Sequence, residues 1–401
     1  MVKSLIKKTV LYRPLAILYD WYHFNINYIQ EVIRILFISP TTQTFFFFPF
    51  FHTGGAELVH LNIVKSMQYQ TVTFFTLPSA NVHFLSEFQQ HSDCHNIEKM
   101  IRSAWRKKII LLCIAFKINR NKFTSVFGCH SLFFYELLPN LKKEIKCVDL
   151  IHAFTHRDEP GFEKFSLPYI NRLNQRVTIS QKGKNDIIEQ YRGLNIPIDL
   201  SNQIHVIYNS TNFTCSEIPI KPTDVFNVVY VGRNSPEKRI SLIGKIASEL
   251  KNNNEMFNIT LVGGDLEQGV NLEDRKSCNF VGNITSLKDL EMIYRTAHVV
   301  LITSTREGIP MALLEGMVFG AVPVSTNVGG ISELIEQKKS GILISCESDY
   351  SRQKKQFTEE IIQLKNDKSL FQLYSNNSFK RANQNFTKKQ FDKNYNEIIQ
   401  S

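Results

Sequence analysis

Cysteine pairs, membrane-length apolar runs and an export signal are all missing from this sequence of 401 residues. Its seven cysteines stand singly, with no Cys-x-x-Cys pair, so neither a zinc finger nor a disulfide framework is indicated. The longest apolar run, Ile109 to Phe116, has eight residues and is too short to cross a bilayer. Arg13, Pro14 and Asp20 interrupt the N-terminal apolar stretch, which is therefore a poor signal peptide. We expect a cytoplasmic protein, since single cysteines suit a reducing compartment.

Several common ligand-binding motifs are also absent. No Asp-x-Asp pair occurs, which argues against a sugar transferase that holds its nucleotide through a metal ion, and we expect no metal and no cofactor. No Walker A or G-x-G-x-x-G pattern occurs, which argues against ATPases and common NAD enzymes. The net charge is +10, but no helix-turn-helix, RNP or zinc-finger pattern supports a nucleic-acid partner.

Strands and helices alternate in two successive runs, which predicts an α/β fold of two Rossmann-like domains with parallel sheets. We expect the first core strand at Ile33 to Ser39, with the phenylalanine run Phe45 to Phe51 after a polar turn. The predicted divisions are an amphipathic extension at 1–32, an N-terminal acceptor domain at 33–212, a C-terminal donor domain at 213–380 and a final helix at 381–401.

The most informative segment is 299–331, VVLITSTREGIPMALLEGMVFGAVPVSTNVGGI, which predicts a strand, a loop, a helix and a second strand. Ligands of open α/β sheets bind beyond the carboxyl ends of strands, so Glu307, which follows the first strand, lies where chemistry is expected. Glu315 falls in a helix that is otherwise apolar on every face, and a buried glutamate needs a partner. We expect ligand hydroxyls there; the alternative is a salt bridge to a core Arg or Lys.

Three further loops carry candidate ligand-binding residues. In VGRNSPEK, Gly232 allows a sharp exit from a strand, and Arg233 and Lys238 then present two cations that suit a diphosphate. Gly54 and Gly55 precede a helix, where backbone N–H groups can approach an anion; a plain tight turn is the alternative. His130 and His152 each end an apolar strand, and we favour His152 because a polar loop follows it.

The region 102–122 contains seven basic residues and no acidic residue, interleaved with Trp105, Phe116 and the apolar run. A basic, aromatic helix of this kind fits an anionic membrane surface. The alternative is an ordinary helix with a solvated basic face.

These motifs together resemble family 4 of the GT-B glycosyltransferases, which are retaining and use nucleotide sugars. EGIPMALLEGMVFGAVPVSTNVGGISELI is similar to the family's Glu-x7-Glu segment, VGRNSPEK to its donor-phosphate motif and HTGGAE to its glycine-rich loop. The resemblance covers roughly 33–345 and implies two domains facing a cleft, with the last helix packing back on the N-terminal domain. Arg239 and the turn Gly264-Asp265-Leu266 depart from the pattern, because each lacks a glycine that the family often has.

By this resemblance the protein is a retaining, metal-independent hexosyltransferase that takes a UDP-sugar or GDP-sugar. Its acceptor would be a glycan, lipid-linked or in lipopolysaccharide, in surface polysaccharide synthesis at the inner face of the plasma membrane. The implied catalytic residues are Arg233, Lys238, Glu307 and His152. The implied donor-binding residues are Gly54, Gly55, Gly232, Gly308, Ile309, Pro310 and Glu315. Two alternatives remain: a GT-B epimerase or hydrolase of nucleotide sugars, and a non-catalytic GT-B scaffold.

Overall fold

The computed structural model describes residues 25–121, 124–154, 161–253, 256–346 and 349–400. The chain divides into two compact units, which we describe separately. The first comprises Met1–His52, Met67–Asp149 and Pro168–Asn174, and the second comprises Thr53–Ser66, Leu150–Leu167 and Gln175–Ser401. Among the described residues, no helix combines the length and the apolar character that a transmembrane span requires.

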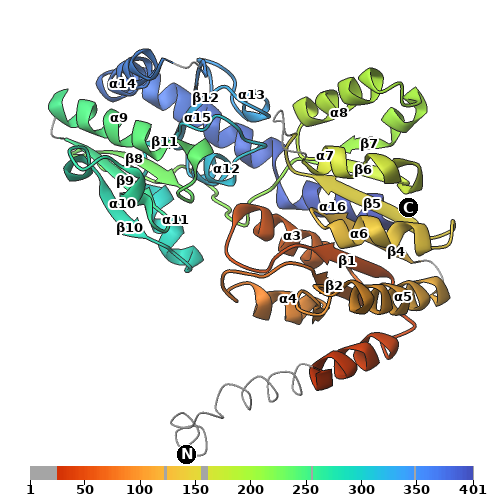
Figure 1. Ribbon diagram of the computed structural model, residues 1–401. Helices are drawn as coiled ribbons and strands as arrows, with labels where there is room; N and C mark the ends of the chain where they lie inside the picture. The colour runs from red at the N-terminus through yellow and green to blue at the C-terminus, as the bar shows by residue number, and fades with distance from the viewer. Residues whose placement is uncertain (1–24, 122–123, 155–160, 254–255, 347–348, 401) are drawn as a thin grey trace, which may run out of the picture. The chain divides into compact units, whose positions relative to one another are not determined.

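The strands form two parallel sheets, as the alternating sequence pattern predicts (Figure 1). The seven-stranded sheet has the order β3-β2-β1-β4-β5-β6-β7. Its strands are β1 (Thr44–Phe48), β2 (Thr71–Phe75), β3 (Asp93–Asn96), β4 (Ser125–Cys129), β5 (Lys146–Ile151), β6 (Gln175–Thr178) and β7 (Ile204–Val206). The associated helices are α3 (Gly55–Ser66), α4 (Leu85–His91), α5 (Ala104–Arg120), α6 (Leu132–Leu137), α7 (Phe162–Phe165) and α8 (Gln181–Gly193).

The six-stranded sheet has the order β10-β9-β8-β11-β12-β13 and lies wholly in the second unit. Its strands are β8 (Phe226–Val231), β9 (Phe257–Val262), β10 (Asn279–Gly282), β11 (Val299–Ile302), β12 (Val322–Thr326) and β13 (Ile342–Ile344). The helices of this part are α9 (Ile240–Asn253), α10 (Leu266–Gly269), α11 (Leu287–Thr296), α12 (Met311–Val318), α13 (Ile331–Leu334), α14 (Tyr350–Asn366), α15 (Lys368–Asn385) and α16 (Lys388–Gln400). These two Rossmann-like α/β sheets confirm the predicted fold class.

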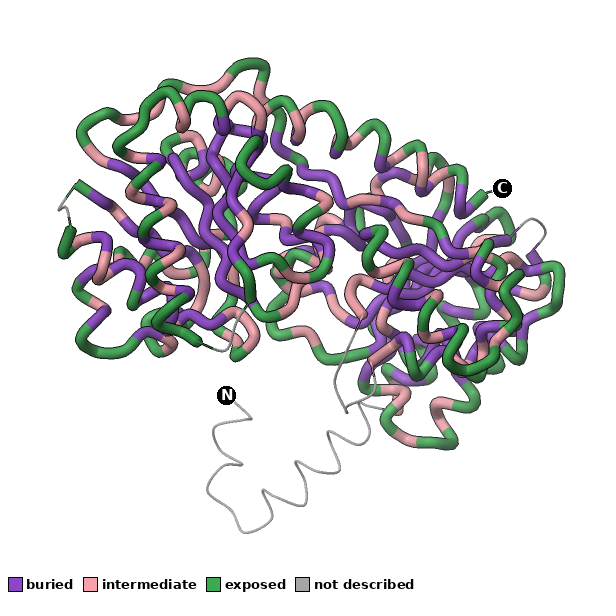
Figure 2. Tube along the Cα trace, turned by 90° about the horizontal axis from the view of Figure 1, so that it is seen from above, coloured by how far each residue is buried: buried purple, intermediate pink, exposed green. Residues whose placement is uncertain are grey.

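The strands carry the buried residues and the outer helix faces carry the exposed ones (Figure 2). Strand β1 shows the pattern most clearly, because Phe45, Phe46, Phe47 and Phe48 are all fully buried. A central parallel strand is covered on both faces, so a continuous apolar run suits it better than an alternating one. Phe47 stacks on Phe74 of β2 with ring centroids 5.0 Å apart, which ties the two strands together through side chains as well as through the backbone.

The prediction of a first core strand at Ile33 to Ser39 is wrong. Residues 25–36 are helical, and the first strand is β1. The buried residues Tyr28, Glu31 and Ile35 recur every three to four positions, which is the period of a helix face. The isoleucines of 33–39 are typical of a strand. The phenylalanine run takes the place in the sheet instead, because each aromatic side chain buries about 150–250 Å².

The C-terminal helix returns to the N-terminal half of the chain, as the family resemblance implies. Helix α16 packs against α3, beside which it lies in Figure 1. Asn396 Nδ2 donates to the backbone oxygen of Ser66 over 2.7 Å, at the end of α3. Both helices belong to the second unit. The domain boundaries near 32, 212 and 380 stay predictions.

Candidate functional site

The catalytic and donor-binding residues that the resemblance implies all lie in the second unit. Several of them lie in the loop between β11 and α12. Strand β11 is buried throughout, and Thr303 and Ser304 continue it as buried polar residues. Pro310 then stands at the N-cap of α12 with φ −67° and ψ 123°. Gly320, with φ +72°, follows the end of that helix. The loop 303–310 thus begins at the carboxyl edge of the sheet. Ligands of open α/β sheets bind beyond this edge.

Close backbone contacts fix the path of this loop. A Cβ atom on Gly308 would lie 2.4 Å from the backbone oxygen of His152, so only glycine fits without a shift. Gly330 N donates to Gly308 O over 2.9 Å. Gly329 has φ +57°, and a Cβ atom there would lie 1.8 Å from Glu307 O. The backbone at Glu307 and Gly308 is therefore held by neighbours far away in the sequence.

Lys238 and Glu307 form the ion pair at the centre of the site. Lys238 Nζ lies 2.6 Å from Glu307 Oε1, and the side chains are 20% and 9% exposed. Ser304 Oγ donates to the same carboxylate oxygen over 2.6 Å. Two cross-links between the loops support the pair: Thr303 Oγ1 donates to Lys238 O, and Thr305 N donates to Glu237 O, each over 2.8 Å. Sequence reasoning placed both charged residues at the sheet edge but missed Ser304.

Arg233 has a more open position than Lys238. Its side chain is 77% exposed and its Nη2 lies 3.6 Å from Glu237 Oε1. Burial raises the pKa of Glu237, but a hydrogen bond from its own backbone N–H and the charges of Arg233 and Lys238 lower that pKa overall. Gly232, which follows β8, packs closely on Gly263, which follows β9. A Cβ atom on Gly263 would lie 1.9 Å from Gly232 O. The exposed guanidinium stays available to a ligand.

Arg239 is a residue whose role the sequence did not predict. It adopts the left-handed conformation, with φ 53°, at a position where a glycine is frequent in the resembling family. Its buried guanidinium donates through Nε to Thr303 O and through Nη1 to Gln353 Oε1, the latter over 2.7 Å. Arg239 therefore connects the Lys238 loop to the loop that carries Glu307. Asp265, with φ 56°, is a second non-glycine residue in this conformation.

Glu315 lies on α12 and has a partner of a kind that we did not expect. Tyr294 of α11 donates its hydroxyl to Glu315 Oε2 over 2.8 Å, in place of the core Arg or Lys that was the alternative to a ligand. Burial raises the pKa of Glu315 to about 7, although the Tyr294 hydrogen bond acts in the opposite direction. The contact with ribose hydroxyls stays a prediction.

The glycine-rich loop and α3 meet the start of α12. Helix α3 begins at Gly55, and Glu57 in its first turn folds back so that its Oε2 lies 2.0 Å from where a Cβ atom of Gly54 would be. That carboxylate suits the positive end of the helix dipole. A Cβ atom on Gly55 would lie 3.5 Å from Met311 Cγ, so α3 and α12 begin side by side. Gly55 thus lies beside Met311, the first residue of α12. A role of Gly54 and Gly55 in donor binding stays a prediction.

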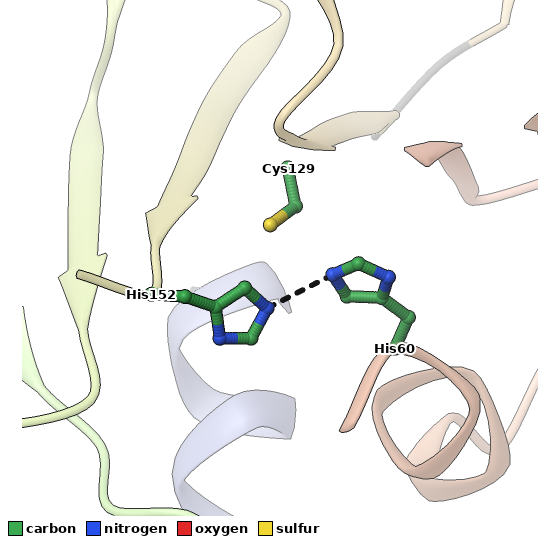
Figure 3. Close-up of side chains that lie close together, drawn as sticks. All are labelled: His60, Cys129 and His152. Atoms are coloured by element: carbon green, nitrogen blue, oxygen red, sulfur yellow. Dashed lines mark hydrogen bonds between the residues drawn. The ribbon is translucent and has the colours of Figure 1, made fainter. Parts of the chain in front are cut away.

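His152 follows β5 and shares a hydrogen bond with His60 of α3 (Figure 3). The two Nε2 atoms lie 3.0 Å apart, so one carries a proton that the other accepts. His60 is fully buried and the sequence analysis missed it; a histidine within the apolar stretch of a helix is the signal that could have found it. Cys129, also drawn in Figure 3, ends β4 of the first unit. His130, the less favoured candidate, is also in that unit, and burial lowers its pKa to about 4.

Glu333 secures the segment that follows Gly329 and Gly330. Its carboxylate accepts hydrogen bonds from the backbone N–H groups of Gln181 and Lys182, both over 2.7 Å, at the first turn of α8. The Tyr208 hydroxyl also donates to Glu333, over 2.9 Å. A carboxylate at a helix N-terminus is stabilised by the unpaired N–H groups and the helix dipole. This contact holds the segment that packs on Glu307 and Gly308.

The chain is similar in sequence and in fold to known glycosyltransferases. The sequence pattern of the family "Glycosyl transferases group 1" matches residues 215–384. One component of the human phosphatidylinositol N-acetylglucosaminyltransferase is 27% identical over 237 residues, which cover 55% of this chain and 46% of that protein. A Campylobacter jejuni α-1,4-N-acetyl-D-galactosaminyltransferase, named for a GalNAc-containing undecaprenol-diphosphate acceptor, is 27% identical over 134 residues, 32% of this chain and 36% of that enzyme. The chain thus matches less than half the length of these two relatives.

Among solved structures, Anabaena HepE in complex with UDP superimposes with a TM-score of 0.70 at 16% identity. The superposition covers 89% of this chain and 99% of HepE. At that identity the likeness concerns the fold. Together these findings place residues 215–384 among the group 1 glycosyltransferases and show that the chain has the fold of the GT-B glycosyltransferases.

Proposed function

We propose that this glycosyltransferase moves a hexose-type sugar from a UDP-sugar or GDP-sugar to a glycan acceptor, with retention of anomeric configuration. The observation that supports it best is the Lys238–Glu307 pair, joined by Ser304, at the carboxyl edge of the six-stranded sheet. In the proposed reaction the bond from the anomeric carbon to the diphosphate oxygen breaks. The acceptor oxygen then bonds to the same face of that carbon, and its proton passes to the departing diphosphate.

The side chains would divide this work by charge. Lys238 and Arg233 would stabilise the negative charge that develops on the diphosphate, and two cations there make a metal ion unnecessary. Glu307 would bind the sugar, and Glu315 would accept hydrogen bonds from the ribose hydroxyls. Gly54, Gly55 and Gly308 would let the backbone approach the donor, because glycine has no side chain to keep the two apart. His152 would lie near the sugar, with its ring held by His60.

We propose further that the acceptor is lipid-linked or part of a lipopolysaccharide, in surface polysaccharide synthesis, and that the enzyme acts in the cytoplasm at the inner face of the plasma membrane. The names of the two curated relatives support this, since one includes phosphatidylinositol and the other undecaprenol diphosphate. The basic character of α5 supports it too, because cations are attracted to anionic lipids.

The experiment is a screen of nucleotide sugars against lipid-linked glycan acceptors, followed by mass spectrometry of the product. A mass increase of one hexose that depends on Lys238 is the expected result, and NMR of the new linkage would report its configuration. Donor incubated without acceptor separates the alternatives, because a hydrolase or epimerase would convert it alone. UDP and GDP should also raise the melting temperature, since a ligand at 100 times its Kd adds about 2.7 kcal/mol. A chain that binds no nucleotide and transfers no sugar would refute the proposal.

A further inference from the structure

Two helices of the first unit lie side by side: the helix over residues 25–36 and α5. Tyr28 OH donates to Arg106 O over 3.3 Å, and Arg106 Nη2 donates to Asn25 Oδ1 over 2.9 Å. At the other end Lys117 Nζ donates to Leu36 O over 3.3 Å. Because contacts occur near both ends in the same order, the helices run parallel along their shared length.

Each of these helices has a second apolar face besides the one that packs on the protein. On α5 this face consists of Trp105, Ile109, Leu112 and Phe116, spaced by four, three and four residues, and Trp105 is 59% exposed. On the other helix it consists of Ile29, Ile33 and Leu36, followed by Phe37, which is 82% exposed. These spacings place each set on one side of its helix. We call these eight residues the outer apolar face.

An ionic cluster fixes the helix over 25–36 on the edge strand β3. Buried His95 forms hydrogen bonds with the carboxylates of Glu31 and Asp93, the second over 3.3 Å. Arg34 pairs with the same two carboxylates over 3.1 and 3.2 Å. The helix is thus held by these charged residues, while Ile29, Ile33 and Leu36 stay exposed. Exposed apolar residues gathered on two adjacent helices indicate a binding site more strongly than single exposed ones do.

Cations border the outer apolar face. Helix α5 contains five basic residues and no acidic residue. Lys108 and Arg120 are exposed, and the Arg120 guanidinium lies 5.2 Å from the Phe116 ring centroid. Arg106 and Lys107, in contrast, are engaged within the protein: Arg106 lies over the Trp105 ring at 4.9 Å and Lys107 pairs with Glu136 at 2.8 Å. Lys108 and Arg120 are therefore the cations best placed to meet an anionic partner.

We propose that the outer apolar face inserts into the interfacial layer of an anionic lipid bilayer, with Lys108 and Arg120 at the level of the head groups. Apolar side chains surrounded by cations match the layered chemistry of that surface. A second copy of this chain fits less well, because a symmetric contact would bring the same cations together. This inference deepens the proposed function, on which it rests, by naming the surface through which a lipid-linked acceptor is approached.

The test measures vesicle binding of the full chain without donor, so that its outcome is independent of sugar transfer. The vesicles contain phosphatidylcholine with or without phosphatidylglycerol. Ile109→Asp with Leu112→Asp should lower partitioning into anionic vesicles by roughly tenfold or more, since these residues would otherwise be buried in lipid. Ile33→Asp should lower it as well, which tests the second helix. Ile220→Asp, at a 98% exposed position of the second unit, is the matched control and should bind as wild type.

Two further measurements sharpen the result. Lys108→Gln with Arg120→Gln should weaken binding to anionic vesicles and reduce its salt dependence, with little effect on neutral ones. In a Trp21→Phe background, brominated lipids should quench Trp105 fluorescence if that ring enters the bilayer. Equal binding by the aspartate variants and wild type would overturn the proposal. So would a wild-type dimer that these variants dissociate, because a second copy would then cover the face.

Discussion

Glu307 and Glu315 are separated by seven residues, yet the loop before α12 and the helix itself give them different surroundings. Glu307 faces the Lys238 ammonium group at 2.6 Å and accepts a hydrogen bond from Ser304. Glu315 has a neutral phenol as its partner, and burial raises its pKa to about 7. The residue type is the same, so the difference comes from the neighbour that tertiary packing supplies. The predictions below test that contrast, beginning with the largest expected effect.

Removing the cation should have the strongest effect on catalysis. We expect Lys238→Ala to lower kcat/KM by roughly 10²–10³-fold, the scale of losing one transition-state charge stabiliser. Lys245→Ala, at an exposed position of α9, is the matched control and should leave turnover unchanged. Initial rates with a radiolabelled donor would measure both. Full activity of Lys238→Ala would show that the Lys238–Glu307 ion pair is not needed for catalysis.

Glu315→Gln should change the pH dependence of stability. The folded-state pKa of Glu315, about 7, is above its ordinary value of 4.5. The contribution of Glu315 to the free energy of unfolding is therefore fully present below pH 4.5 and is lost as the pH rises through about 7. The glutamine keeps an acceptor for Tyr294 and has no charge to bury. The variant should therefore be more stable than wild type above pH 7, by on the order of 3 kcal/mol at 1.36 kcal/mol per pKa unit.

Urea denaturation of both proteins at pH 5 and pH 8 would measure this difference. If the variant and wild type differ in stability by the same amount at pH 5 and at pH 8, the wild-type carboxyl is not held in its neutral form. Glu307→Gln, measured in parallel, should show no such gain at pH 8, because it removes the partner of Lys238.

Gly308→Ala tests whether the path of the loop positions Glu307. Its new methyl group would meet the His152 carbonyl at 2.4 Å, so the backbone must move. Crowding of this kind costs about 1–3 kcal/mol of the free energy of unfolding. We expect the variant to remain folded at the assay temperature and to have a lower kcat than wild type. Gly193→Ala in α8 is the control, because a Cβ atom there meets nothing within 4 Å. Equal kcat values for the two variants would contradict a positioning role for this contact.

Tyr294→Phe should have the smallest effect. It removes one buried hydrogen bond and should cost about 1 kcal/mol at neutral pH. Because that hydrogen bond lowers the pKa of Glu315, its loss should shift the pH midpoint of stability upward. A pH series of denaturation curves would detect the shift. An unchanged midpoint would mean that the phenol does not act on Glu315.

Much of the fold could be predicted from the sequence, because buried parallel strands are continuous apolar runs. Strand β11, helix α12 and strand β12 follow one another within 299–331, in the order that the sequence of this segment predicts. Strand β3, Asp93–Asn96, was missed because a polar edge strand with mixed exposure has no such pattern. The last residues of the helix over 25–36 were mistaken for the start of a strand at Ile33 to Ser39, because isoleucines suit both elements and only packing shows which face is buried.

The sequence by itself determined the alternation of elements and the placement of Lys238, Glu307 and the glycines at strand ends, since these follow from local composition and chain order. Only the tertiary structure decided the partners: Ser304 for Glu307, Tyr294 for Glu315 and His60 for His152. Each of the last two pairs joins different elements, and such contacts depend on how sheets and helices pack. Packing also decided that Arg239 adopts a left-handed conformation, because its guanidinium is held by Thr303 and Gln353.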